Sequence, residues 1–213
     1  MTIPEGFFDI SQEAIENRRA YWLALGRFID MFSTVECTVQ LAVAKFSNVK
    51  DSVARAVFSG VRIKEGSSFI RRIMEVTNHP SDKRADMEDV LKQLGFITDL
   101  RNEILHYGAL PSDGPETIVT NKHIALTEDR ITNRPVSKTI LMEATNDLHK
   151  IQAHLVFVHL PPAYQGAPDD YVRSMTGLLT AAWRYIPPQQ QKAAKKTLGA
   201  PPAQSPPPQS SQG

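Results

Sequence analysis

The chain has almost no cysteine and almost no excess of charge, and these absences exclude several classes of protein. Cys37 is the single cysteine among 213 residues, so no intrachain disulfide can form and no cysteine pair exists for a zinc finger. The formal net charge is only +1, which argues against a protein that coats nucleic acid through bulk charge. A local basic site remains compatible with this balance.

Long apolar runs and a basic leader are also missing. No stretch approaches the apolar length that crosses a bilayer. The first ten residues carry Glu5 and Asp9 but no basic start, unlike a signal peptide. Apolar residues make up 41% and charged residues 22%, as in soluble globular proteins with a sizeable core. We therefore expect a cytoplasmic protein without a membrane partner and without a metal or cofactor.

Composition divides the chain into a domain, residues 1–186, and a tail, residues 187–213. The tail is rich in Pro, Gln and Ser and cannot bury enough apolar surface to offset its chain entropy, so we expect it to be disordered. In the domain, apolar residues recur at helical spacing between Pro, Gly and Ser breaks. The predicted helices cover about residues 11–46, 51–59, 66–77, 83–107, 141–159 and 169–185.

A short stretch between the fourth and fifth predicted helices follows a different pattern. Residues 117–127 hold Ile118-Val119 and Ile124-Ala125-Leu126 around Asn121-Lys122, which predicts a small β-hairpin. The predicted fold class is therefore an all-α bundle with one irregular insert.

Two charged residues interrupt the predicted apolar stripes. Glu36 fills a missing step in the first helix, and Arg101 fills one between Ile97 and Ile104 in the fourth. A lone buried charge is costly, so we expect Glu36 and Arg101 to face each other between helices. Such a pair fixes helix register or orients Arg101 in a cleft, and the two roles are compatible. The first stripe consists of Trp22, Leu25, Ile29, Phe32, Val39, Val43 and Phe46.

The stretch Arg101-Asn102-Glu103-Ile104-Leu105-His106 contains the residue types that RNA cleavage needs. Asn102 and His106 are four apart and share a helix face, whereas Arg101 must extend toward them from another face. His106 could take the proton of an RNA 2′-OH or protonate the leaving 5′-oxygen. Arg101 could stabilise charge on the phosphoryl oxygens, and Asn102 could orient His106 or hold the phosphate. One histidine supplies one proton transfer, so a two-fold dimer would supply both.

Residues 101–106 resemble the motif of HEPN domains (higher eukaryotes and prokaryotes nucleotide-binding), in which four to six residues separate an arginine from a histidine. Asn102 after Arg101 matches the common form, and residues 28–36 resemble the first long helix of several HEPN families. The similarity spans roughly residues 15–160. It implies a dimeric helical bundle with the motif at the dimer cleft. Many members are metal-independent ribonucleases of toxin–antitoxin and antiviral systems.

By this resemblance, Arg101, Asn102 and His106 are active-site residues, and Glu36 is a weaker candidate. The expected partners are RNA, a second copy of the chain, and an antitoxin or regulatory protein. Some HEPN toxins carry a modified tyrosine two places after the histidine. Here Tyr107 follows His106 directly and Gly108 takes that place, so regulation by that modification is not expected.

Two other functions fit the same residues. The chain could be a non-catalytic RNA- or protein-binding module in which Arg101 and Glu36 form a structural pair, or a nucleotide-sensing subunit with a ligand in the dimer cleft. His149, His154 and His159 recur every five residues and spiral around their helix, which favours surface or interface positions over a metal site. Trp22 and Trp183 belong to helical stripes, so we expect core or dimer contacts for them.

Overall fold

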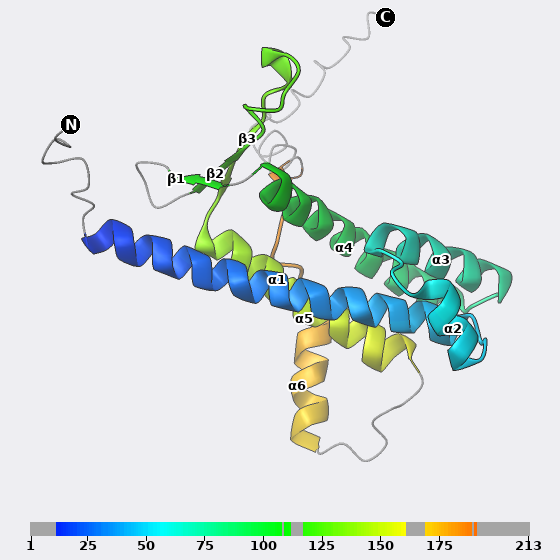
Figure 1. The fold of residues 1–213 in the computed structure, drawn as a ribbon. Helices are drawn as coiled ribbons and strands as arrows, with labels where there is room; N and C mark the ends of the chain where they lie inside the picture. Colours follow the sequence, from blue (N-terminus) through cyan, green and yellow to red (C-terminus); the bar gives the residue numbers. More distant parts are fainter. Residues whose placement is uncertain (1–11, 108, 112–116, 161–168, 189, 191–213) are drawn as a thin grey trace, which may run out of the picture.

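Packed helices and a small sheet at one end make up the computed structural model, which describes residues 12–107, 109–111, 117–160, 169–188 and 190 (Figure 1). The mainly helical class is confirmed. The helices are α1 (Gln12–Phe46), α2 (Asp51–Phe58), α3 (Ile63–Val76), α4 (Ser81–Tyr107), α5 (Lys138–Ala153) and α6 (Asp169–Thr180). A π-helical turn, η2 (His154–His159), continues α5. No described helix has the length and apolar character needed to cross a membrane.

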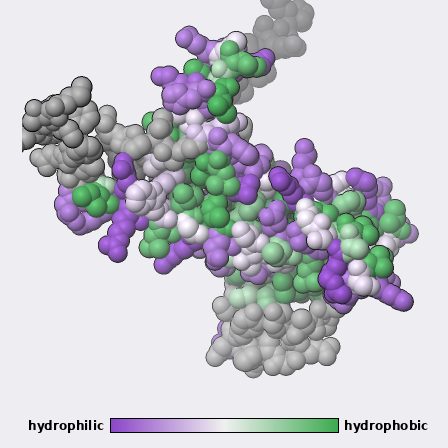
Figure 2. Space-filling view, in the orientation of Figure 1, coloured by the Kyte–Doolittle hydropathy of each residue, from purple (hydrophilic) through white to green (hydrophobic). Residues whose placement is uncertain are grey.

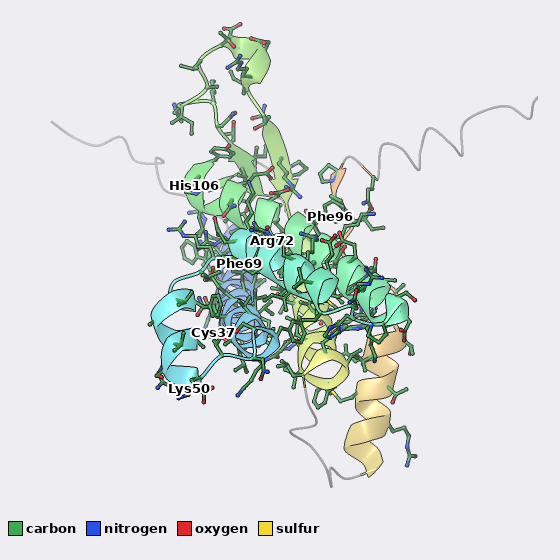
Figure 3. All side chains as sticks on the ribbon, turned by 90° about the vertical axis from the view of Figure 1, so that its right-hand side faces the viewer. Cys37, Lys50, Phe69, Arg72, Phe96 and His106 are labelled. Atoms are coloured by element: carbon green, nitrogen blue, oxygen red, sulfur yellow. The ribbon has the colours of Figure 1, made fainter. Side chains whose placement is uncertain are left out.

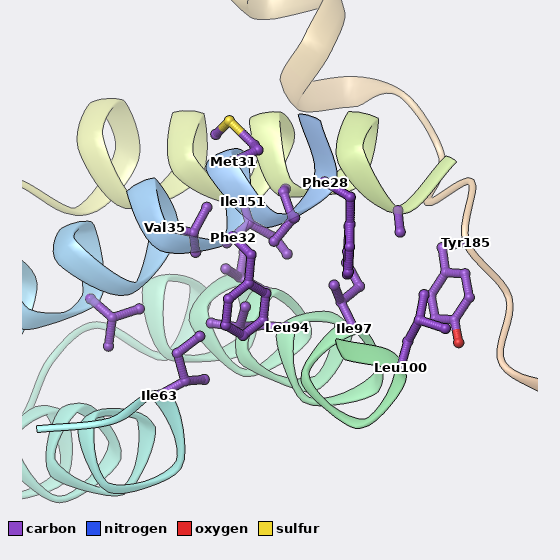
Figure 4. Packing of buried hydrophobic residues seen from close by; sticks show 14 of the residues in the cluster. Phe28, Met31, Phe32, Val35, Ile63, Leu94, Ile97, Leu100, Ile151 and Tyr185 are labelled. Atoms are coloured by element: carbon purple, nitrogen blue, oxygen red, sulfur yellow. The ribbon is translucent and has the colours of Figure 1, made fainter. Parts of the chain in front are cut away.

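The long helix α1 lies along α5 and α3, and the core forms where these helices and α4 meet (Figures 1 and 4). Burial of these apolar side chains is the main favourable term in folding. The fully buried side chains include Phe28, Val35, Ile70, Leu94, Ile97, Leu100, Leu141, Leu148 and Ile151.

Gly66 sets how closely α3 approaches α1. A Cβ atom added at Gly66 would lie 2.6 Å from Cγ1 of Val39, a distance that side-chain atoms do not tolerate. The missing side chain therefore lets α3 pack directly on α1. The start of α3 at Ile63 also brings this glycine inside the helix, whereas the sequence predicts a start near residue 66.

The buried face of α1 includes Phe32, Val39 and Val43 of the predicted stripe but is shifted by one residue at other positions. Trp22, expected in the core or in a dimer contact, is 62% exposed in the single chain, while Tyr21 beside it is buried. At the position of Glu36 the core residue is Val35, and at Arg101 it is Leu100, both fully buried. The expectation that the two charges replace core residues is therefore wrong: they lie half-buried at the edges of the apolar faces.

The irregular insert is a three-stranded antiparallel sheet, and the predicted hairpin is correct only in its first strand. The strands are β1 (Ala109–Pro111), β2 (Thr117–Thr120) and β3 (Asn133–Val136), in the order β1-β2-β3. Residues 124–126 form no strand; they lie in the connection that leads through the 3-10 helix η1 (Glu128–Arg130) to β3. The Asn121 side chain closes this connection, because it donates to Arg130 O (3.0 Å) and accepts from Thr132 N (2.7 Å).

Helix α6 ends at Thr180, and residues 181–187, here called the C-terminal segment, form no helix. The predicted extension of this helix to Tyr185 is wrong. Asp147 on α5 accepts hydrogen bonds from the backbone N–H groups of Arg184 (2.9 Å) and Tyr185 (2.8 Å), and Gln93 donates to Tyr185 O (2.9 Å). Side chains thus satisfy backbone groups that a helix would otherwise pair.

The boundary of the predicted tail also changes. Pro187 is buried, so the folded part of the chain continues past the predicted boundary at residue 186. Residue 189 and residues 191–213, where most of the predicted disorder falls, lie outside the described residues.

Candidate functional site

The C-terminal end of α4 opens onto a pocket of 270 Å³, here called the α4 pocket. Its wall on α4 is formed by Phe96, Asp99, Asn102, Glu103, His106 and Tyr107. These positions are three or four apart, the spacing that places side chains on one helix face. Figure 3 shows His106 at the end of the helix and Phe96 farther back along it. Arg134 from β3 and Tyr185 and Pro187 from the C-terminal segment complete the lining.

Asn102 and His106 share this pocket, but Arg101 does not line it. The guanidinium carbon of Arg101 lies 5.4 Å from the centroid of the Phe32 ring on α1, within range of a cation–π contact. Its Nη1 also donates a hydrogen bond of 3.1 Å to Oδ1 of Asn102. Arg101 therefore orients the Asn102 amide from outside the pocket lining. His106 is exposed.

Glu36 does not form the predicted pair with Arg101, and no ion pair joins the two in the described part of the chain. The residue lies half-buried on α1, one turn after Phe32. Arg101 is only half-buried and lies over the Phe32 ring, so it is not a lone buried charge that requires a carboxylate partner. This arrangement joins α1 to α4 through an aromatic contact in place of a salt bridge.

Arg134, Glu103 and Tyr185 form a connected group in the α4 pocket that the sequence does not predict. Arg134 makes an ion pair with Glu103 and donates a hydrogen bond to the Tyr185 hydroxyl. Burial raises the pKa of Tyr185; the charges of Glu103 and Asp99 act in the same direction and Arg134 opposes them. Arg134 lies in a short strand without any periodic pattern, so only the fold brings it to α4.

A second polar cluster lies away from the α4 pocket, where α4, η2 and α6 meet. Oδ2 of Asp86 lies 2.7 Å from Nε2 of His159 and 3.2 Å from Nδ1 of His154. The His159 side chain is 1% exposed and His154 is buried, so these two histidines do not lie on the surface, which was one of the two positions predicted for them. His149 is exposed. No group of three or more His, Cys, Asp or Glu residues within the described ranges could hold a metal ion.

Burial and pairing shift the titration of this cluster. Burial lowers the pKa of His159, and this effect outweighs its hydrogen bond with Asp86. Burial alone would raise the pKa of Asp86, but the hydrogen bonds and charges of His159 and His154 lower it overall. The fold therefore favours a neutral His159 that donates from Nε2 to an ionised Asp86.

No family model, curated sequence or solved structure matches this chain. The HEPN resemblance thus stays a prediction that rests on residues 101–106 and 28–36. The geometry itself provides an exposed imidazole, an oriented amide and a paired arginine around one small pocket. Such a set can transfer a proton and hold a polar ligand.

Proposed function

We propose that this chain is a metal-independent endoribonuclease of HEPN type that acts as a homodimer, in toxin–antitoxin or antiviral defence. The observation that carries the proposal is that Asn102 and His106 line the same pocket at the end of α4. A histidine can move the protons of the reaction, so RNA cleavage by 2′-OH attack requires no bound metal.

His106 has the exposure that an acid–base residue at a substrate surface needs. It would take the proton of the 2′-OH as the oxygen attacks the adjacent phosphorus, or protonate the leaving 5′-oxygen. The Asn102 amide, held by Arg101, would donate to a phosphoryl oxygen or to the imidazole. Arg101 would then be a positioning residue, since its guanidinium lies against Phe32.

A second copy of the chain would supply the second proton transfer. Apolar side chains remain available for such a contact on the first half of α1, where Ile15, Trp22 and Leu23 are 49%, 62% and 59% exposed. Figure 2 shows hydrophobic side chains among hydrophilic ones along this helix. Exposed aromatic residues such as tryptophan are enriched in protein interfaces.

The test is RNA cleavage by the purified protein in the presence of EDTA. His106→Ala should lower the cleavage rate by about 10²–10⁴-fold, the usual contribution of a general acid or base. His149→Ala removes an exposed histidine from α5 and should leave the rate unchanged. Cleavage that is equal in His106→Ala and the unaltered protein, or no cleavage by either, would reject the proposal.

The position of Arg101 favours a second candidate function, a non-catalytic module that binds RNA or a nucleotide. A guanidinium packed on Phe32 does not line the α4 pocket, so the cation expected to stabilise phosphoryl charge is not placed there. In this case RNA or a nucleotide would bind without being cut. His106→Ala would then change neither the affinity for RNA nor the cleavage of RNA. Binding measured beside cleavage separates the two functions.

A further inference from the structure

The α4 pocket presents one free carboxylate and one oriented amide side by side. Asp99 and Asn102 are three residues apart on the wall of the pocket, and therefore neighbours on one helix face. Asp99 is exposed and forms no ion pair or hydrogen bond with the rest of the described chain. Glu103, the other acidic residue of the wall, is neutralised by Arg134. Asp99 is thus the carboxylate that a ligand can use.

The orientation of Asn102 determines what the amide offers. Its Oδ1 accepts the hydrogen bond from Arg101, so the opposite side of the amide carries the two N–H donors of Nδ2. A ligand on that side must accept from Asn102 and donate to Asp99. The pocket therefore selects for an acceptor next to hydrogen-bond donors.

Among the four RNA bases, guanine alone fits this order along its Watson–Crick edge. Its N1–H and N2 amino group are adjacent donors that one carboxylate can accept together, and O6 beside them is an acceptor for an amide. Adenine presents the N6 amino donor beside the N1 acceptor, cytosine presents the N4 amino donor beside N3 and O2, and uracil presents N3–H between O4 and O2. None of the three therefore offers two adjacent donors to one carboxylate, and each leaves an acceptor facing it. RNA-binding proteins commonly recognise unpaired bases through this edge.

We propose that the α4 pocket binds a guanine base, with Asp99 as the residue that determines specificity and Asn102 as the donor to O6. A volume of 270 Å³ lies just below the range of about 300–1,000 Å³ for small-molecule sites, so it suits one base and not a folded RNA. Phe96 and Tyr107 provide aromatic rings in the same lining for base stacking. The guanine belongs either to RNA or to a free nucleotide, and only the first case rests on the proposed ribonuclease function.

Calorimetric titration of the full chain with GMP, IMP and AMP tests this assignment. GMP should bind at least about fivefold more tightly than AMP, the lower end of discrimination by a paired base contact. IMP lacks the N2 amino group and should bind less tightly than GMP. Asp99→Asn turns one acceptor into a donor and should remove the preference for GMP, whereas Asp30→Asn, which neutralises an exposed carboxylate on α1, should preserve it.

Equal affinity for GMP and AMP, no binding of either base as nucleotide or RNA, or an unchanged preference in Asp99→Asn would overturn the assignment. Short single-stranded RNAs with one G or one A distinguish the source of the base: selective binding of RNA alone indicates an RNA residue, and selective binding of GMP alone indicates a free nucleotide. Selective binding without RNA cleavage would reject the ribonuclease and keep the guanine site. Cleavage without selectivity would do the reverse.

Discussion

Polar side chains gather in two regions of this molecule, and their surroundings differ. Around Asp86 and Asp147 the polar groups are largely buried and bonded to one another or to the C-terminal segment. Lys150 belongs to the same region: it donates to Ala181 O and lies 4.0 Å from the centre of the Trp183 ring. In the α4 pocket, His106 and Asp99 are exposed and have no such partners among the described residues.

The difference separates structural from functional polar residues. Buried groups with complete sets of partners stabilise one arrangement of the chain, because leaving any of them unpaired is costly. Exposed groups around a pocket contribute little to folding and keep their hydrogen-bonding capacity for a ligand. Substitutions in the first region should thus change stability, and substitutions in the second should change binding or activity.

The largest effect on stability is expected from Asp147→Ala. The change leaves the backbone N–H groups of Arg184 and Tyr185 without their acceptor and removes one of the two acceptors of the Gln93 amide. It should lower the free energy of unfolding by about 3 kcal/mol. Urea denaturation followed by circular dichroism measures it. Asp129→Ala, at an exposed position in η1, is the control, and equal stability of the two variants would contradict a structural role.

Arg101→Ala should have a smaller effect. It removes the cation–π contact with Phe32 and the hydrogen bond to Asn102, together worth about 1 kcal/mol at a half-buried site. The same denaturation experiment applies, with Arg27→Ala on the exposed side of α1 as the matched control. If Arg101→Ala is as stable as Arg27→Ala, the contact with Phe32 is not structural.

Acidification should weaken the first region through His159. Because burial lowers the pKa of His159 below its ordinary value of 6.5, the unfolded chain binds this proton more readily, so stability falls as the pH drops below about 6.5. Asp86, Lys83 and His154 are the charged or titratable groups that act on it. The Tm of the unaltered protein should be lower near pH 5.5 than near pH 7. This difference should be smaller in His159→Gln. His149→Gln should keep the full difference, and identical pH profiles for both variants would exclude His159 as the cause.

The smallest effect on stability is expected from His106→Ala. Since the imidazole is exposed and has no partner in the described residues, the free energy of unfolding should change by no more than about 0.5 kcal/mol. Denaturation curves for this variant and the unaltered protein check this. A loss of unfolding free energy above about 1 kcal/mol would show that His106 stabilises the fold, as the buried polar residues of the first region do.

Helix limits were predictable where breaking residues stand close to the apolar pattern. Helix α4 ends at Tyr107 as expected, because Gly108 follows it, and it begins at Ser81, two residues before the predicted start. The phase of the buried face was less predictable, since Tyr21 and Trp22 are adjacent and both fit an apolar stripe. Only the packing of α1 in the folded chain buries the first and exposes the second.

The amino-acid sequence by itself determined the helical class, the C-terminal end of α4 and the common face of Asn102 and His106, because helix periodicity and end signals are local properties of the chain. The tertiary structure decided that Phe32, and not Glu36, contacts Arg101. It also brought Arg134 and Tyr185 to the pocket and turned His154 and His159 inward. These contacts join residues far apart in the chain, and no local pattern encodes which long-range partners meet.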